Sequence, residues 1–122
     1  MPIDRVSNLI PFVQVADVDH SIAFYKQLGF DVTDTYVHEG KLDFAALESA
    51  SAQVMLVRAG GRIDPRQQGV RFYLYAEDLD ALRNHLTANG ITAGPIGDGT
   101  PGPDREMTVR DPDGYCLLVA EI

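Results

Sequence analysis

Few side chains in this sequence have the type and spacing that catalysis or metal binding requires. The three histidines, His20, His38 and His85, share no metal-ligand spacing, and each is better explained as a surface or helix-flanking residue. Glu39, next to His38, could hold an ion weakly, although exposed turns commonly carry such residues. We find no Ser-His-Asp order, no phosphate-binding glycine loop and no pair of catalytic carboxylates. These residues give no positive indication of an enzyme.

Cys116 is the remaining candidate for reactivity, and it is the single cysteine of the 122 residues. An intrachain disulfide and a cysteine-rich zinc site are therefore excluded, and a reducing cytoplasm is the expected location. As a nucleophile, the thiol would need a base or a positive neighbour, a role that Arg71 could fill. The pattern favours the alternative, in which Cys116 is a small hydrophobic residue in a strand.

Composition and charge narrow the class of protein. Hydrophobic residues make up 45% and charged residues 23% of the chain, as in globular domains. Ten basic and eighteen acidic residues give a net charge of −8, which opposes binding to nucleic acid. No run approaches the roughly 18 apolar residues of a membrane span, and the first residues lack the apolar stretch of a signal peptide. The charge would suit a cationic ligand, although a surface kept soluble by repulsion explains it as well.

The elements that must position any site begin with a strand over residues 9–15. Asp17 follows as a helix N-cap, ahead of apolar residues at helical spacing, and Gly29 ends this helix. Three further strands are then predicted, over residues 30–37, 42–47 and 53–57. The first two are joined by a hairpin turn at 38–41. The first half of the chain is thus predicted to be β-α-β-β-β.

The same pattern starts again after a glycine-containing linker at about 59–69. The elements of the second half are a strand over 70–75, a helix capped by Asp78 and ending at Asn89-Gly90, a weaker strand over 91–96, a loop over 97–103, and strands over 107–110 and 115–121 joined by a turn at 111–114. The interval from Asp17 to Asp78 equals the interval from Gly29 to Gly90, which indicates an internal repeat.

This repeat predicts one α+β domain spanning residues 1–122 and built from two βαβββ modules. Module one covers about residues 8–58 and module two about residues 70–122. Neither module alone would bury much apolar surface, so the halves should pack together or exchange with a second chain.

Alternation along the strands separates a face under the helices from a helix-free face. Val13, Val15, Phe72, Leu74 and Ala76 are apolar and should lie under the helices. The candidate ligand-binding residues on the opposite face are Phe12, Gln14, Met55, Arg71, Tyr73, Tyr75, Cys116 and Leu118. Such a mixture of aromatic, polar and charged groups predicts a concave pocket. The alternative is a face that meets another sheet or a partner subunit.

Two segments resemble a known superfamily. The run VADVDHSIAFY at residues 15–25, followed by Leu28-Gly29-Phe30, resembles the opening signature of the vicinal oxygen chelate superfamily. This group includes glyoxalase I, extradiol dioxygenases, fosfomycin-resistance enzymes and bleomycin-resistance proteins. The closing DPDGY at residues 111–115 resembles its last hairpin turn. The resemblance implies paired βαβββ modules whose mixed β-sheet curls around a cavity with the helices outside, commonly in a homodimer.

Metal-dependent members of this superfamily place His, Glu or Gln at four cavity positions. The resemblance maps these positions onto Ile10, Val57, Arg71 and Leu118. Three of these side chains offer no lone pair and the fourth is a cation, so the set cannot bind a divalent ion. The resemblance therefore implies a protein without a metal or other cofactor, and it disfavours glyoxalase, dioxygenase and fosfomycin-transferase chemistry.

The function that the resemblance implies is metal-independent binding of a small molecule, such as an antibiotic, in the manner of bleomycin-resistance proteins. Phe12, Tyr73 and Tyr75 could stack on the ligand, Gln14 could form a hydrogen bond, and Arg71 could pair with an anionic or carbonyl group. Net charge favours a cationic ligand while Arg71 opposes one, so the ligand is left open. The alternatives are a glyoxalase-like lyase or isomerase with a non-standard site, and a protein-interaction module.

Overall fold

The structure, a computed structural model, describes residues 5–97 and 105–122. The first half contains β1 (Phe12–Val15), α1 (Val18–Lys26), β2 (Asp31–His38), β3 (Lys41–Ser49) and β4 (Ala52–Arg58). The second half contains the short 3-10 helix η1 (Pro65–Gln67), β5 (Arg71–Ala76), α2 (Leu79–Ala88), β6 (Glu106–Arg110) and β7 (Cys116–Glu121). Within the described ranges, no helix is long and apolar enough to cross a membrane.

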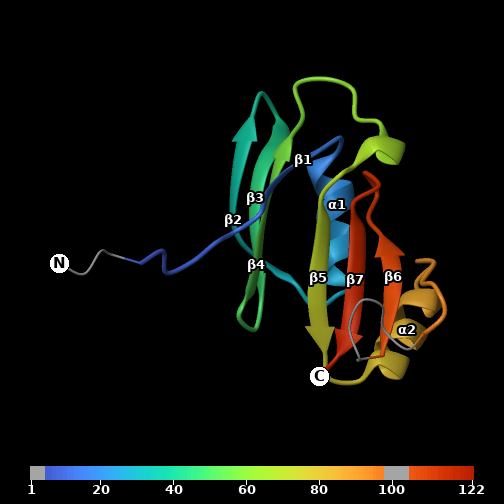
Figure 1. Cartoon of the computed structure of the whole chain (residues 1–122). Helices are drawn as coiled ribbons and strands as arrows, with labels where there is room; N and C mark the ends of the chain where they lie inside the picture. Colours follow the sequence, from blue (N-terminus) through green and yellow to red (C-terminus); the bar gives the residue numbers. More distant parts are fainter. Residues whose placement is uncertain (1–4, 98–104) are drawn as a thin grey trace.

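The strands form two separate mixed sheets (Figure 1). The first sheet has the order β1-β4-β3-β2, and the second has the order β5-β7-β6. In each sheet the opening strand pairs in parallel, β1 with β4 and β5 with β7, whereas the hairpin strands pair antiparallel. The predicted α+β class with a repeated module is confirmed.

Each helix begins after an aspartate that caps it and is followed by a glycine with positive φ. The Asp17 carboxylate accepts a hydrogen bond from the His20 backbone N–H at 3.1 Å, and the Asp78 carboxylate accepts one from the Ala81 N–H at 3.0 Å. Gly29 and Gly90 follow the helices with φ values of 93° and 77°, a conformation that side chains disfavour. The landmarks that revealed the repeat therefore perform the same structural role in each half.

The core lies between each helix and its sheet. Helix α1 packs on β3 and β4, and α2 packs on β7. Val13 and Val15 are buried under α1, whereas Phe72, Leu74 and Ala76 are partly buried and pack against the same core cluster. Alternate residues of β1 and β5 are exposed, so the predicted division into a covered and a helix-free face is confirmed.

Two expectations differ from the structure. The strand predicted over 91–96 is wrong: Ala93 and Gly97 form only isolated bridges, with Val109 and Glu106. Pro95 lies between them and has no N–H to donate to a ladder, which limits pairing there. The sheets are also two and not closed, so one chain does not curl a single sheet around a cavity. The loop predicted at 97–103 falls, except for Gly97, outside the described residues.

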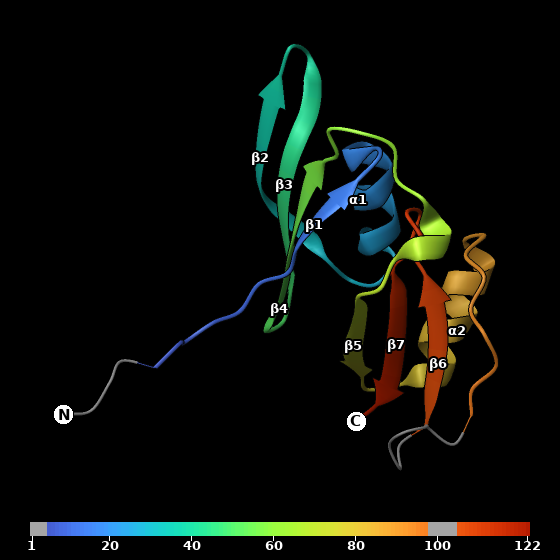
Figure 2. The ribbon, with the colours of Figure 1, turned by 45° about the horizontal axis from the view of Figure 1, so that its top comes forward.

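Polar contacts hold the second half against the first. The turn between β6 and β7, residues 111–114, is called here the DPDG turn, and it lies close to α1 (Figure 2). The Asp113 carboxylate accepts hydrogen bonds from the Ala16 N–H at 2.8 Å and from the Ser21 hydroxyl at 3.4 Å. The Tyr25 hydroxyl donates to the Asp111 carboxylate at 2.8 Å. Both carboxylates are buried and satisfied, so this contact fixes the relative position of the halves.

Candidate ligand-binding faces

The helix-free face of the second sheet brings together five of the eight predicted site residues. Residues paired across neighbouring strands project from the same face. The pairing defines three rows across β5, β7 and β6: Arg71, Cys116 and Arg110; then Tyr73, Leu118 and Thr108; then Tyr75, Ala120 and Glu106. Arg71, Tyr73, Tyr75, Cys116 and Leu118 are therefore direct neighbours on one face.

On this face the central strand is more buried than the two strands beside it. The central strand is β7, where Cys116 is 7% exposed and Ala120 is fully buried. On the β5 side, Tyr73 and Tyr75 are 42% and 61% exposed, and their rings meet edge to face with centroids 5.3 Å apart. More exposed side chains of β5 and β6 flank the more buried ones of β7, and this strip of the face is called here the β7 trough.

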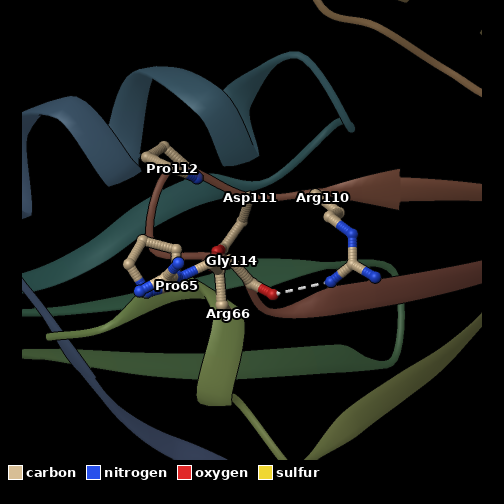
Figure 3. Close-up of a pocket in the computed structure, with 6 residues that line it drawn as sticks. All are labelled: Pro65, Arg66, Arg110, Asp111, Pro112 and Gly114. Atoms are coloured by element: carbon tan, nitrogen blue, oxygen red, sulfur yellow. Dashed lines mark hydrogen bonds between the residues drawn. The ribbon is translucent and has the colours of Figure 1, made fainter.

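The two ends of the β7 trough carry opposite charge. Arg71 and Arg110 flank Cys116 at the end next to the DPDG turn. Glu106 lies at the other end and accepts a hydrogen bond from the Tyr73 hydroxyl at 2.9 Å. Arg110 donates one hydrogen bond, at 3.2 Å, to the Gly114 carbonyl oxygen (Figure 3). No acidic side chain of residues 5–97 and 105–122 forms an ion pair with either arginine of this end.

Arg110 also borders an open hollow of about 480 Å³ beside the trough. The hollow is lined by Pro65, Arg66, Arg110, Asp111, Pro112 and Gly114, which Figure 3 shows around the DPDG turn. Arg110, Thr108 and Glu106 are not among the site residues predicted from the sequence. Polar and apolar residues alternate strictly along residues 106–110, and Met107 and Val109 are the buried ones. This alternation could have placed the other three residues on the helix-free face.

The other three predicted residues lie on the helix-free face of the first sheet. Phe12 pairs with Met55, and Gln14 pairs with Val57 on the neighbouring strand. Phe12 is 61% exposed and makes an edge-to-face contact with Phe44, with ring centroids 6.0 Å apart. This face therefore offers aromatic and amide groups, without a guanidinium at these positions.

Between the two halves lies a hollow of about 570 Å³ whose lining includes Arg71 and Tyr73 but none of the other six predicted residues. The sheets share no strand, and Figures 1 and 2 show them standing apart. Phe12 on one face and Tyr75 on the other remain mostly exposed. A pocket that contains all eight residues therefore needs a further chain or a change in the relative position of the halves.

The four positions that would hold a metal in related enzymes carry no suitable donor. Arg71 and Leu118 lie in the β7 trough, Val57 lies on the first sheet, and Ile10 precedes β1. Within residues 5–97 and 105–122, no three His, Cys, Asp or Glu side chains gather as potential ligands for a metal ion. The donor set of these described residues does not fit a divalent cation.

The sequence matches the family model described as Glyoxalase/Bleomycin resistance protein/Dioxygenase superfamily over residues 3–118. This match covers most of the chain, including both halves of the repeat. A comparison with curated protein sequences gave no match.

Solved structures of similar fold include proteins that bind antibiotics. A bleomycin-binding protein complexed with bleomycin is 18% identical, with a TM-score of 0.76 over 96% of this chain and 99% of that one. The bleomycin-binding protein of Streptomyces verticillus, complexed with copper(II)-bleomycin, is 21% identical, with a TM-score of 0.73 over 98% and 99%. TnmS3, an antibiotic binding protein from Streptomyces sp. CB03234, is 23% identical, with a TM-score of 0.71 over 99% and 98%. These likenesses establish a shared fold.

Proposed function

Because this chain belongs to the glyoxalase/bleomycin resistance protein/dioxygenase superfamily, we propose that it binds a small organic molecule without a metal and without transforming it. The proposed site consists of Phe12, Gln14, Met55, Arg71, Tyr73, Tyr75, Cys116 and Leu118. Antibiotics are the first class to consider, because similar structures are described as bleomycin-binding and antibiotic binding proteins.

The observation that carries this proposal is the β7 trough. It combines mostly apolar side chains on β7, two tyrosines on β5 and charged groups at its ends, which is the composition of small-molecule sites. A protein-interaction surface would more often be flat and apolar at its centre. The described face instead carries charged side chains at both ends.

A homodimer completes the proposed site. Each chain leaves one helix-free face on each sheet, and the exposed aromatic side chains include Phe12, Tyr36, Tyr73 and Tyr75. A two-fold axis that places the first sheet of one chain over the second sheet of its partner would form two identical pockets. Each pocket would then contain all eight residues, three from one chain and five from the other.

Binding is tested most directly by a thermal-shift screen with bleomycin and a panel of aromatic acids, amines and neutral compounds. A ligand at about 100 times its Kd should raise the free energy of unfolding by about 2.7 kcal/mol. Tyr75→Ala should reduce this stabilisation, whereas Thr87→Ala, on the exposed surface of α2, should leave it unchanged. A panel in which no compound raises the melting temperature would contradict the proposed function.

Independence from metal is tested with the same ligand. Dialysis against EDTA should leave both the melting temperature and the ligand affinity unchanged, because the four positions Ile10, Val57, Arg71 and Leu118 provide no metal donor. Loss of affinity after chelation, restored by one equivalent of a divalent transition metal, would instead favour a metal site with unusual ligands.

A further inference from the structure

We propose that the β7 trough selects an organic anion, and that Arg71 and Arg110 hold its carboxylate or sulfonate group above Cys116. This inference rests on the proposed function, because it names the chemical class of the molecule that the same face binds. It adds Arg110 to the site and gives the bound molecule a fixed direction along β7.

The spacing of the strands suits one anionic group between the two arginines. Arg71 and Arg110 are the register partners of Cys116 on either side, so their Cα atoms lie about 10 Å apart, twice the usual strand spacing. Two guanidinium groups on such long side chains can reach one anion from both sides. Cys116 has a small side chain and is almost completely buried, so it leaves the space between them open.

The charges around this end leave the arginines available for a ligand. Arg71 forms no ion pair with any residue of the described part of the chain. Arg110 uses one terminal nitrogen on the Gly114 carbonyl, a neutral acceptor, which orients its guanidinium without neutralising it. An oxyanion that bridges both groups would accept charge-assisted hydrogen bonds and relieve their mutual repulsion.

The rest of the trough defines what the anion is attached to. From Arg71 to Tyr75 the trough runs for about 13 Å along the strand, enough for a body of one or two fused rings. The Tyr73 ring reaches over β7 to Glu106 and meets the Tyr75 ring edge to face, so the two rings offer an aromatic surface on which that body can stack. Glu106, at the far end, would repel a second negative group. We therefore infer an aromatic monoanion whose charge lies at one end.

A matched pair of dyes tests the inference. 1-Anilinonaphthalene-8-sulfonate is an aromatic monoanion, and N-phenyl-1-naphthylamine has the same rings without the sulfonate. Fluorescence titration of the full chain should show at least roughly tenfold tighter binding of the sulfonate, the scale of one charged hydrogen bond. Equal affinity for both dyes would contradict the inference that Arg71 and Arg110 bind an anionic group, and it would leave the proposed function intact. Failure of both dyes to bind would count against the proposed function and this inference together.

Substitutions then locate the effect. Arg71→Met and Arg110→Met should each weaken sulfonate binding roughly tenfold or more while changing the affinity for the neutral dye less than about twofold. Lys26→Met, on α1, removes the same charge from the helical layer and should change neither affinity. Sulfonate binding that survives in both arginine variants would overturn the inference.

A second measurement separates the ligand role from a role in assembly. Sedimentation velocity of both arginine variants should give the same oligomeric state as the unmodified chain. If instead the variants dissociate and both dyes weaken equally, the arginines serve contacts between chains, and the inference is wrong. NMR signals of the Arg71 and Arg110 Nε–H groups should also shift on titration with the sulfonate and remain unchanged with the neutral dye.

Discussion

Asp111 lies in an environment that is unusual for an aspartate in a turn. Turn aspartates usually lie in water, yet this carboxylate is buried and accepts hydrogen bonds from the Tyr25 hydroxyl and from the backbone N–H groups of Asp113 and Tyr115. Burial raises the pKa of Asp111, against the lowering effect of these hydrogen bonds. Burial and the adjacent carboxylate raise the pKa of Tyr25 as well, so its hydroxyl remains a donor.

Tyr25→Phe should lower the free energy of unfolding by about 1.5–3 kcal/mol, because it removes a hydrogen bond to a buried charged group. Tyr25 is 2% exposed, so water cannot replace the lost donor easily. Urea unfolding monitored by circular dichroism measures the change. Tyr36→Phe is the matched control: the Tyr36 side chain is 58% exposed, and the same deletion there should change stability by less than about 0.5 kcal/mol. Equal effects of the two substitutions would contradict the structural role of the Tyr25 hydroxyl.

The raised pKa of Asp111 predicts a specific pH dependence. The native state takes up a proton at this carboxyl at higher pH than the unfolded chain does, so its contribution to the free energy of unfolding rises as the pH falls. Asp111→Asn removes the titration. The stability of the unmodified chain should therefore improve relative to the variant between about pH 7 and pH 4. Urea titrations of both proteins across this range would contradict the prediction if their difference stayed constant.

At the scale of the elements, turns and caps were predictable because their chemistry is local. Glu39 and Gly40, at the tip of the hairpin, have φ values of 51° and 78°. A two-residue hairpin turn of type I′ requires positive φ at both of these positions. Whether residues 91–96 form a strand was not predictable in the same way. Their apolar content favours a strand, but whether a ladder forms there depends on a partner elsewhere in the chain, and Pro95 cannot donate to one.

Gly114, in the DPDG turn, lies against the backbone of η1. Its φ is 87°, and a Cβ atom there would collide with the Pro65 backbone of η1. We expect Gly114→Ala to lower the free energy of unfolding by roughly 3 kcal/mol or more, because the backbone must move. Gly40 has a similar φ of 78° with no atom within 4 Å of a built Cβ. Gly40→Ala should therefore cost only about 1 kcal/mol. Similar losses for both, measured by urea unfolding, would show that η1 yields freely to the new methyl group.

At the scale of the whole molecule, each helix-free face was predictable and their combination was not. Alternation in β1 and β5 gives Phe12, Gln14, Tyr73 and Tyr75 their faces directly. The relative position of the two sheets depends on long-range contacts such as the hydrogen bond from the Ala16 N–H to the Asp113 carboxylate. No short sequence pattern encodes that contact, so the expectation of one cavity per chain could not be tested from sequence.

Phe12→Glu should weaken the proposed homodimer, because it places a charge on an exposed aromatic position that the proposed dimer would bury. Sedimentation equilibrium should give twice the 13.4 kDa chain mass for the unmodified protein and the single-chain mass for the variant at micromolar concentration. Ala81→Glu adds the same charge to the exposed surface of α2 and should leave the dimer intact. A monomeric unmodified chain would contradict the proposal of a shared pocket.

The two modules contribute different groups to the contact made by the DPDG turn. When the two modules are aligned on their helix caps, Ala50 and Ala52 stand where the second module has its two turn aspartates. In the same alignment, Leu82 and Leu86 stand where the first module has its two hydroxyl donors. The second module therefore carries the two carboxylates that accept these hydrogen bonds, and the first module carries the two hydroxyls that donate them. Two copies of the same module would therefore lack these hydrogen bonds between hydroxyl and carboxylate. The same hydrogen bonds would form if the first module of one chain packed against the second module of a neighbouring chain. The contact therefore specifies which two modules pack together, and it can form within one chain or between two.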